Sequence, residues 1–568
     1  MKIFYQGAST WNSSTPTCLD SEPNLLSLSG NSWDDYGTKT TLNASLYFEG
    51  ERLDFDFDIK ILIEGSNHTA ATLAEFKEAG WDGFFPIPSC NYISLPSEIE
   101  FYAIIVSKLG MSEATNLIKL LNDAGFLKNV IEDESSSGLL RSSEFSHSLL
   151  RESGSMKSFE DGWRIFDLSL SEVEINDFEL NVLSKDHKST PIPFRFNSEL
   201  LPYDINVLIG PNGVGKSHAI KSLTEYWLKT ESGDPESLKE LGHEPFSRYP
   251  NFSNLILVSY SPFEDFKLDL KNDEHLNNKT AYKYFGFRKV DEERGCEVVD
   301  RDLPNMNSAE SIIKALYDDE KLSFIEGWVN KLELMIQTLN HGFDVDFLAL
   351  KVVDPSKVGL CEFNVREIDG ERYLPLGPDT AKLNTKLELQ KACDLESGVF
   401  FVYEDRICSL SSGQKLFSYI VINILGELRK NSLVVVDEPE LFLHPTLEIA
   451  FVSLLKKVLG PFKSKAVLAT HSLSIVREVP SNCVHIFRNG IFGLDVVSPP
   501  FETFGGNVQK ISAYVFGEKS ITKPFDEWLE TLVQFNPSAE GLIAQLGDEV
   551  NEQLIMKIHR LARMYHGS

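Results

Sequence analysis

The chain has 568 residues and carries 84 acidic against 54 basic side chains, a formal net charge of −30. Apolar residues make up 42% and charged residues 24%, as in ordinary soluble globular proteins, so wholesale disorder, a collagen-like repeat and a membrane bundle are excluded. The length predicts two to four domains. Because so acidic a surface repels nucleic-acid backbones and anionic lipid, any DNA contact requires a local basic patch or a partner that supplies one.

The seven cysteines are scattered and form no CxxC pair. This pattern argues against a disulfide scaffold or a zinc module and favours a reducing compartment. No apolar run approaches the roughly 20 residues of a spanning helix. The first residues also lack the pattern of a signal peptide. We therefore expect a cytoplasmic protein without a membrane-spanning segment.

Residues 1–160 are predicted to form an N-terminal α+β domain, and they carry no motif that reveals its role. Residues 53–61 alternate strictly between apolar and charged side chains, which predicts a strand with one buried and one wet face. Gly50 and Glu51, just before this run, predict a hairpin turn.

Two helices are expected next, with Ser97 and Ser112 as N-caps and Gly110 and Gly125 as their ends. Such a pair could be a DNA-reading helix-turn-helix, but its mixed and mildly acidic charges favour plain packing. The serine-rich stretch 134–158 then predicts a linker or a mobile loop.

Residues 161–505 alternate between strand and helix patterns, as in a nucleotide-binding α/β domain. A stretch of about 229 to 400 separates two of its motifs and is expected to be a helical insertion. Within it, apolar residues from Leu322 to Leu339 recur at spacings of three and four, which predicts one amphipathic helix packed on its own domain. Residues 506–568 are predicted to be a helical C-terminal tail.

A phosphate-binding loop is predicted after the apolar run 205–209 and before a helical pattern. Its glycines allow backbone N–H groups to curl around phosphate oxygens, and the following helix N-terminus adds partial positive charge. Lys216 is expected to reach the β- and γ-phosphates, and Ser217 to hold Mg²⁺. The motif, which fits GxxxxGK[ST], consists of Gly210, Pro211, Asn212, Gly213, Val214, Gly215, Lys216 and Ser217.

Two carboxylates follow the apolar run 433–436, which predicts a buried parallel strand. Ligands of open α/β sheets bind at the carboxyl ends of such strands. Asp437 is therefore a candidate Mg²⁺ ligand, and Glu438 a candidate for polarising the attacking water. An acidic pair after a strand also serves as a helix N-cap, so the assignment depends on the other motifs.

Two further short motifs lie near this acidic pair. The segment Leu410-Ser411-Ser412-Gly413-Gln414 opens an amphipathic helix 23 residues before Asp437. A predicted strand over 466–470 ends at His471, 34 residues after Asp437. Each motif is weak alone, because serine and glycine often open helices and a histidine at a strand end is usually structural.

In this order, the four motifs resemble those of ATP-binding-cassette ATPases over about residues 165–505. The resemblance implies a P-loop ATPase head that binds ATP and Mg²⁺, with Walker A at 210–217, the signature at 410–414, Walker B at 433–438 and the switch histidine at His471. It also implies a head-to-tail homodimer or a higher oligomer. Ser411 and Gly413 of one subunit would then contact the γ-phosphate held by the other, and Glu438 and His471 would be catalytic.

The continuation of Walker B, Leu441-Phe442-Leu443-His444-Pro445, is similar to the SMC-like and overcoming-lysogenization-defect branch of soluble ATPases. With the tail motif from Thr503 to Gly517, the chain most resembles the ATPase subunit of Septu antiphage systems, which is also found beside some retrons. This resemblance implies a slow ATPase that senses or switches in antiviral defence and controls an HNH effector nuclease. A retron reverse transcriptase with its RNA–DNA product, and DNA contacted through the partner, are further expected partners.

The chain departs from the family pattern in three places. Ser412 replaces the first glycine of the usual signature LSGGQ, a variant that the soluble branch tolerates. The segment 255–263 lacks the expected Q-loop glutamine, which leaves metal coordination there without that residue and predicts slow hydrolysis. No DxD triplet follows His471, so the TOPRIM nuclease of overcoming-lysogenization-defect proteins is not expected in this chain.

Two other function classes are weighed against this interpretation. One is an SMC-like DNA-repair ATPase that binds DNA directly; the net charge and the lack of a long coiled coil oppose it. The cluster Lys456, Lys457, Lys463 and Lys465 could touch DNA, but such lysines are more often a solvated helix face. The other is a transporter ATPase, which the missing Q-loop glutamine and the unassigned N-terminal domain oppose.

Overall fold

The computed structural model describes residues 1–7, 15–35, 37–131, 137–166, 174–184, 188–270, 279–291, 294–325, 327–340, 342–353, 365–383, 386–441, 443–490, 493–516 and 524–566. Phe442 and Gly517, which carry part of the resemblance, lie outside these ranges, as do Cys361 and part of the serine-rich stretch. The chain forms two compact units, Met1–Gly505 and Gly506–Ser568. Within the described ranges, no helix has both the length and the apolar character needed to cross a membrane.

A five-stranded sheet in the order β1-β2-β3-β4-β5 begins the first unit. Its strands are β1 (Lys2–Gly7), β2 (Leu25–Gly30), β3 (Thr41–Phe48), β4 (Glu51–Ile63) and β5 (Tyr92–Pro96). Strands β1 and β2 are parallel, and the other neighbours are antiparallel. The predicted strand over 53–61 is confirmed as part of β4. The predicted turn before it is formed by Glu49 and Gly50, both at positive φ.

Helix α2 (Glu100–Leu121) packs its apolar side on this sheet, and α1 (Thr69–Glu78) lies beside it. The predicted end at Gly110 is a kink, where φ is 76° and ψ is 161°. Two cap predictions are wrong. Ile99, not Ser97, holds the N-cap position, and the left-handed Asn122, not Gly125, ends the helix. Both differences arise because Ser97 is buried and Gly125 lies in the next helix, α3 (Ala124–Phe126).

The prediction of a linker over 134–158 is wrong for its described C-terminal part. After α4 (Ser137–Leu140), residues Ser153–Asp161 form helix α5. Lys157 on α5 is only 2% exposed and donates a 3.1 Å hydrogen bond to Asp161, while it also bonds the carbonyl of Asn251. Close packing explains the small residues nearby: a Cβ on Gly125 would lie 2.7 Å from the Phe159 carbonyl oxygen of α5.

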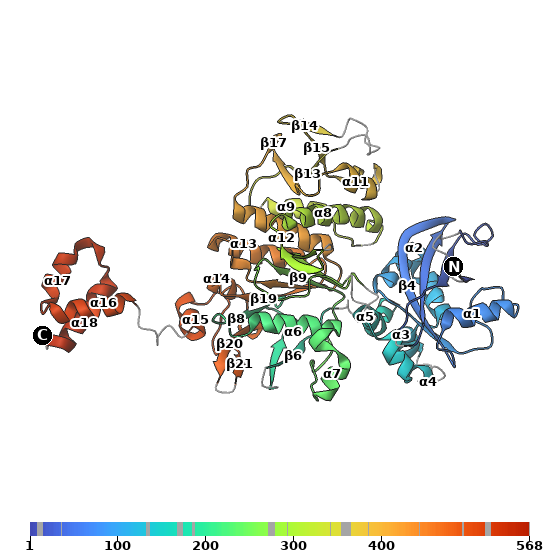
Figure 1. Ribbon diagram of the computed structural model, residues 1–568, viewed down its shortest axis with the longest axis horizontal. Coiled ribbons are helices and arrows are strands. Elements are labelled where there is room, and N and C mark those ends of the chain that lie inside the picture. The colour runs from blue at the N-terminus through green and yellow to red at the C-terminus, as the bar shows by residue number, and fades with distance from the viewer. Residues whose placement is uncertain are drawn as a thin grey trace. The chain divides into compact units, whose positions relative to one another are not determined.

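The central sheet of the first unit has seven strands in the order β10-β9-β18-β19-β8-β20-β21. They are β10 (Tyr282–Gly286), β9 (Leu255–Ser259), β18 (Leu433–Asp437), β19 (Lys465–Thr470), β8 (Ile205–Ile209), β20 (Val484–Gly490) and β21 (Gly493–Val497). All neighbours are parallel except β20 and β21. The sheet separates α6 (Lys216–Leu228) from α12 (Ser412–Glu427) and α13 (Pro445–Leu459) (Figure 1). This is the expected α/β P-loop fold.

The range of about 229 to 400 is not all insertion, since β9 and β10 belong to the central sheet. The rest includes α8 (Leu303–Leu322), α9 (Lys331–Leu339) and a sheet in the order β14-β15-β13-β16-β17 (Figure 1). Its strands are β13 (Phe347–Lys351), β14 (Arg366–Ile368), β15 (Glu371–Pro375), β16 (Val399–Tyr403) and β17 (Arg406–Ile407). The range 229–400 also contains two short helices, α10 (Pro378–Leu383) and α11 (Lys386–Ala392). Its hairpin consists of β11 (Arg288–Asp291) and β12 (Cys296–Val299).

The prediction of one helix through 322–339 is also wrong. Helix α8 ends at Leu322, and α9 begins at Lys331. Asp319, near the end of α8, accepts hydrogen bonds from the backbone N–H groups of Lys331 and Leu332 at 2.8 and 3.0 Å. Leu322 and Ile325 pack on the apolar core of the first sheet, while Leu332 and Leu339 of α9 are buried apart from that core, so the even apolar spacing does not reveal the turn.

The remaining described α-helices and strands of the first unit are β6 (Phe178–Leu183), β7 (Ser189–Phe194), α7 (Pro235–Glu240) and α14 (Leu473–Val476). The second unit is helical, with α15 (Val508–Val515), α16 (Pro524–Phe535), α17 (Ala539–Leu546) and α18 (Glu552–His566). Helices α16, α17 and α18 share an apolar core that includes Leu529, Val533, Leu542, Ile558 and Leu561.

Candidate functional site

The phosphate-loop motif joins β8 to α6. Gly213 and Gly215 both have positive φ, at 75° and 103°, a conformation that favours glycine. Val214 between them is only 5% exposed and fixes the loop in the apolar core. Gly215 holds the N-cap position of α6 and has no side chain that could bond the first N–H groups of the helix. The loop therefore offers backbone donors of the kind that bind phosphate oxygens.

Lys216 and His471 lie side by side, although 255 residues separate them. The Lys216 Nζ atom donates to His471 Nε2 at 2.8 Å, and to the carbonyls of Gly210 and Pro211 at 3.0 and 3.2 Å. Burial lowers the pKa of Lys216. Burial, together with the nearby Lys216 charge, lowers the pKa of His471 to about 4. The imidazole is therefore neutral at physiological pH, and its Nε2 atom accepts a hydrogen bond from the lysine ammonium.

Asp437 ends β18 next to the loop and is only 2% exposed. Within the described part of the chain, neither of its carboxylate oxygens forms a hydrogen bond of ordinary geometry, although the Ser217 hydroxyl lies near enough to favour its charged form. Burial, then the charges of Glu264 and Glu438, raise the pKa of Asp437 to about 8, while Ser217 and Lys216 oppose this rise. An unpaired buried carboxylate is costly unless a cation or a proton compensates it. Its surroundings therefore fit a divalent cation held between Asp437 and the Ser217 hydroxyl.

Glu438 has a φ of 50°, an uncommon value for a residue other than glycine. Its backbone N–H donates to the carbonyl of Ala469 on β19 at 2.8 Å. Its Oε1 atom lies 3.7 Å from His471 Nε2. Because the imidazole is neutral, this contact is no ion pair near pH 7. Strained backbone of this kind collects at functional sites.

Glu440 was not singled out by the sequence reasoning. Its carboxylate accepts hydrogen bonds from the Thr470 hydroxyl at 2.8 Å and from the backbone N–H of His471. Glu440 therefore fixes the turn on which His471 sits. It lies three residues after Asp437, yet the strand pairing of β18 with β19 is needed to bring it to this turn.

Glu264 was missed as well. Strand β9 pairs with β18 so that Ser259 stands opposite Asp437, and Glu264 follows five residues later. Burial, followed by the charge of Glu438, raises the pKa of Glu264, while Ser217 and Lys216 lower it. Glu264 thus faces the same groups as Asp437. The available signal was an acidic residue five positions after a buried apolar strand.

The signature residues lie at the start of α12. Ser411 is its N-cap and forms a capping box with Gln414: Gln414 N–H donates to Ser411 Oγ at 3.3 Å, and Ser411 N–H to Gln414 Oε1 at 3.0 Å. Ser411 and Ser412 are exposed. Among the described residues, no hydrogen bond or ion pair joins Ser411 or Gly413 to residues 210–217. The structure therefore brings together Lys216, Asp437, Glu438 and His471, but not the signature residues.

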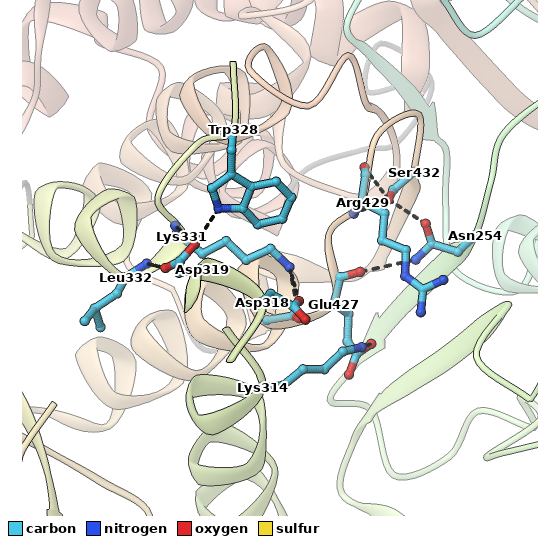
Figure 2. Close-up of polar contacts among 11 residues, drawn as sticks. Asn254, Lys314, Asp318, Asp319, Trp328, Lys331, Leu332, Glu427, Arg429 and Ser432 are labelled. Atoms are coloured by element: carbon cyan, nitrogen blue, oxygen red, sulfur yellow. Dashed lines mark hydrogen bonds and ion pairs between the residues drawn. The ribbon is translucent and has the colours of Figure 1, made fainter. Parts of the chain in front are cut away.

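The far end of α12 is held by a polar network (Figure 2). Glu427, its last residue, pairs with Lys314 of α8. Lys331 of α9, 1% exposed, donates to Asp318 at 2.7 Å and to the Gly426 carbonyl at 3.4 Å. Just beyond the helix, Arg429 approaches Glu98 of the N-terminal region to 3.9 Å. The signature helix is thus fixed at its base to the insertion and to residues of the first 160.

The predicted lysine cluster does not form a free basic patch. Lys465 is 8% exposed and pairs with Asp204 at 2.9 Å. Lys456 donates to the Glu478 carbonyl at 3.0 Å and lies over the Phe504 ring. Two of the four lysines are therefore engaged within the chain, which weakens the case for direct DNA contact here.

Residues 301–477 match the family model described as "AAA domain, putative AbiEii toxin, Type IV TA system". This range contains the signature, Walker B and His471, and the phosphate loop lies before it. Protein ea59 of Escherichia phage lambda is 24% identical over 561 residues, 93% of each chain. The chain thus has a P-loop α/β fold, and the segment 301–477 is similar to this AAA family.

Two solved structures of ATPase heads also resemble this chain. The SMC head domain from Thermotoga maritima is 11% identical and covers 58% of this chain and 100% of its own, with a TM-score of 0.27. The ADP conformation of an ATP-binding cassette of an ABC transporter is 14% identical and covers 61% of this chain and 95% of its own, with a TM-score of 0.25. At these TM-scores the fold assignment rests on strand order and motifs instead.

Proposed function

We propose that this chain binds ATP with Mg²⁺ at residues 210–217 and hydrolyses it to ADP and phosphate. The observation that carries the proposal is the unpartnered, buried Asp437 beside the phosphate loop. Each of three residues has a separate role in such a site. Lys216 binds an anion, Ser217 binds a cation, and the charge of Asp437 is compensated by that cation. Their meeting at the carboxyl edge of one parallel sheet supports a nucleotide site.

The residues of the loop have distinct roles in this proposal. The backbone N–H groups of residues 213–217 bind phosphate oxygens. Lys216 exchanges its bonds to Gly210, Pro211 and His471 for the β- and γ-phosphates. Ser217 and Asp437 hold the cation. A bound Mg²⁺ neutralises the charge that develops on the phosphate oxygens.

Glu438 and His471 serve the hydrolytic step. The carboxylate of Glu438 accepts a hydrogen bond from the attacking water and orients it toward the γ-phosphate. His471, released from Lys216 when the lysine turns to phosphate, is then free to donate or accept at Nε2 near the same position. Glu440 keeps this histidine in place.

The second half of the site comes from another copy of the chain. The exposed start of α12 carries Ser411 and Gly413, and a helix N-terminus attracts phosphate. Because these residues make no bond to the phosphate loop of their own chain, we place them against the ATP of a second subunit in a head-to-tail dimer or higher oligomer. ATP would then join the subunits through its γ-phosphate.

Nucleotide binding and hydrolysis are tested by two substitutions. Lys216→Ala removes the main phosphate-binding cation, so the affinity for ATP is expected to fall at least tenfold. Glu438→Gln retains the shape but loses the base, so ATP is expected to bind normally and turn over at least a hundredfold more slowly. Equilibrium binding measures the affinity for ATP, and phosphate release measures the rate of hydrolysis. If Glu438→Gln hydrolyses ATP at the parent rate, Glu438 is not the catalytic carboxylate.

We further propose that this ATPase is a cytoplasmic switch in antiviral defence, as in Septu systems, and that it controls an HNH effector nuclease. In this proposal the switch consists of three regions: residues 1–160, the ATPase domain 161–505 and the tail 506–568. The family description that mentions a toxin system, and a relative of similar length in a phage, support a role in conflict between phage and host. The net charge of −30 supports DNA contact through a partner, for example the nuclease or a retron product.

The switch is tested by expressing the chain with its genomic neighbours and purifying it with and without ATP. A nuclease is expected in stoichiometric amounts, with its activity changed by nucleotide, because a ligand can shift a state only by binding two states differently. If the chain always purifies alone and instead binds DNA with a steep salt dependence, the DNA-repair alternative is favoured.

A further inference from the structure

The phosphate-loop helix α6 ends against residues of the first 160. Lys229 holds its C-cap position in the left-handed conformation, with a φ of 57°. The Lys229 Nζ atom donates hydrogen bonds to the carbonyl oxygens of Arg151 and Leu150, at 3.0 and 3.5 Å. Burial, followed by the charge of Lys60, lowers the pKa of Lys229 to about 8. The ammonium group at the end of α6 is therefore held by the N-terminal region.

The segment 148–151, which Lys229 contacts, is itself bonded to the first sheet. Lys60 of β4 is fully buried, and its Nζ atom donates to the Ser148 carbonyl at 2.8 Å. The Ser148 hydroxyl donates to the buried Asp35 carboxylate, also at 2.8 Å. The end of α6 is thus connected to the five-stranded sheet through this segment.

The signature helix α12 ends against the same region. Arg429, just beyond this helix, lies 3.9 Å from Glu98, which comes just before α2. Although burial opposes it, the charges of Glu100 and Glu98 raise the pKa of Arg429. The Arg429 backbone N–H donates to Ser432 Oγ at 2.8 Å, which fixes the residue to the loop that leads into β18 (Figure 2). Both helices that begin at proposed phosphate-binding motifs therefore end on residues 1–160.

A further contact connects α12 with the first sheet through its neighbour α8. Helix α8 packs closely on α12 around Gly426. Just beyond the end of α8, the centre of the Phe324 ring lies 3.7 Å from Lys108 Nζ of α2 and 6.4 Å from the centre of the Phe55 ring of β4. A shift of α12 would therefore also displace side chains that pack on the first sheet.

Nucleotide changes the bonds at the opposite ends of these helices. Lys216, the first residue of α6, bonds to His471 and to two loop carbonyls, and in the proposed function these bonds pass to the phosphates. The start of α12 contacts the ATP of a second subunit in the same proposal. A helix is a rigid element, so a shift at its start reaches its end. Because leaving a desolvated charge without its partner is costly, Lys229 and Arg429 are expected to keep their contacts and carry the shift across.

We propose that residues 1–160 respond to the nucleotide, because the far ends of α6 and α12 transmit ATP binding to segment 148–151 and to the start of α2. This gives a role to a region whose sequence carries no recognisable motif. Such coupling is reciprocal, so a partner that binds residues 1–160 and distinguishes the two states changes the affinity for ATP by the same factor. This inference rests on the proposed ATP site.

Hydrogen exchange of the full-length chain, followed by mass spectrometry, tests the coupling. Exchange is compared without nucleotide and with a non-hydrolysable ATP analogue and Mg²⁺. The analogue is expected to protect peptides that cover 210–217. It is also expected to change the exchange rates of peptides that cover 98–109 and 148–151 by about threefold or more, because their packing differs between the two states.

Two variants separate the two contacts. Lys229→Met keeps the length of the side chain but removes the ammonium group, so the response of 148–151 is expected to disappear while that of 98–109 remains. Glu98→Gln removes the charge that faces the end of α12 and is expected to have the opposite effect. Lys239→Met, at an exposed position on α7, is the control and should keep both responses.

The outcomes that contradict the proposal can be told apart. If 210–217 is protected while neither 98–109 nor 148–151 responds, the ATP site stands and only this inference fails. If Lys229→Met and Glu98→Gln both keep the parent responses, the coupling does not pass through these contacts, and the inference fails as well. If 210–217 is not protected in the folded parent, the proposed ATP site fails and the inference fails with it. Circular dichroism shows whether the variants are folded, and the comparison within the parent does not depend on them.

Discussion

At the scale of single residues, the site is organised around groups whose protonation is shifted by burial. Lys216 donates a hydrogen bond to the neutral His471, and buried Asp437 has the Ser217 hydroxyl beside it but no cation bonded to its oxygens among the described residues. These arrangements cost stability in the chain alone and are relieved by a cation and an anion together. This is the behaviour expected of a site built for a metal–nucleotide complex rather than for packing.

Asp437 makes the folding stability of the chain depend on pH. Its pKa is about 8 in the folded chain, whereas an unfolded aspartate titrates near ~4. Because the folded state holds a proton that the unfolded state has lost, stability falls as the pH rises from about 4 to about 8. Asp437→Asn removes this loss, so its free energy of unfolding should exceed that of the parent by about 1–3 kcal/mol at pH 8.

Thermal unfolding in EDTA without nucleotide, at pH 5 and pH 8, measures this effect. The melting temperature of Asp437→Asn should exceed that of the parent, and the gap should be larger at pH 8. Asp265→Asn, at an exposed position, serves as the control and should show no such gap. If the melting temperature of Asp437→Asn exceeds that of the parent by the same amount at both pH values, ionisation of this carboxylate does not cause the difference in stability.

At the scale of elements, the signature helix α12 is fixed closely against α8. A Cβ on Gly426 would lie 2.6 Å from the Ser311 carbonyl oxygen and 2.7 Å from the Ser311 Cβ atom. The two helices can approach this closely only because residue 426 has no side chain. The same end of α12 carries the network of Lys331 and Glu427, so its position is set by contacts far from the signature itself (Figure 2).

Gly426→Ala is therefore expected to force the two helices apart and to lower the free energy of unfolding by about 1–3 kcal/mol. Gly460→Ala is the matched control, because its Cβ would meet a single atom at an ordinary 3.5 Å. Differential scanning calorimetry of both variants measures the change. If Gly426→Ala unfolds with the parent, α8 and α12 accommodate a methyl group and the contact is looser than described.

At the scale of the whole molecule, the proposed function brings the phosphate loop and the signature together between subunits. This predicts complementation in a mixture of two inactive chains. Lys216→Ala disables the loop. Gly413→Asp places a negative charge against the partner's phosphates, yet suits the first turn of a helix and leaves the Ser411 cap intact. A mixed dimer contains one complete site. The Gly413→Asp chain supplies its intact phosphate loop, and the Lys216→Ala chain supplies its intact signature.

The mixture is therefore expected to hydrolyse ATP at a rate that is a substantial fraction of the parent rate, while each variant alone hydrolyses little. Phosphate release from a titration of one chain into the other measures this. Rates that stay at the sum of the two separate chains would show that a site is complete within one subunit. Mixing parent with Gly413→Asp, which dilutes intact pairs, provides the control.

Much of the fold was legible from the sequence, because its signals are local. The alternation in 53–61 predicted β4, and the phosphate loop was predicted because glycines at fixed spacing between a strand and a helix have few other uses. The linker at 134–158 and the single helix through 322–339 were wrong. In both, the deciding contacts join residues far apart in sequence, such as Lys157 with Asn251.

The sequence by itself determined which groups are available: a loop that binds phosphate, an acidic pair after a buried strand and a histidine after the next strand. Only the tertiary structure decided which further residues join them. Glu264 and Glu440 lie in the site because β9, β18 and β19 are neighbours in one parallel sheet, which aligns their carboxyl ends. Strand order depends on packing across the whole domain, so the acidic residue after the 255–259 strand could not be assigned to the site from its local pattern alone.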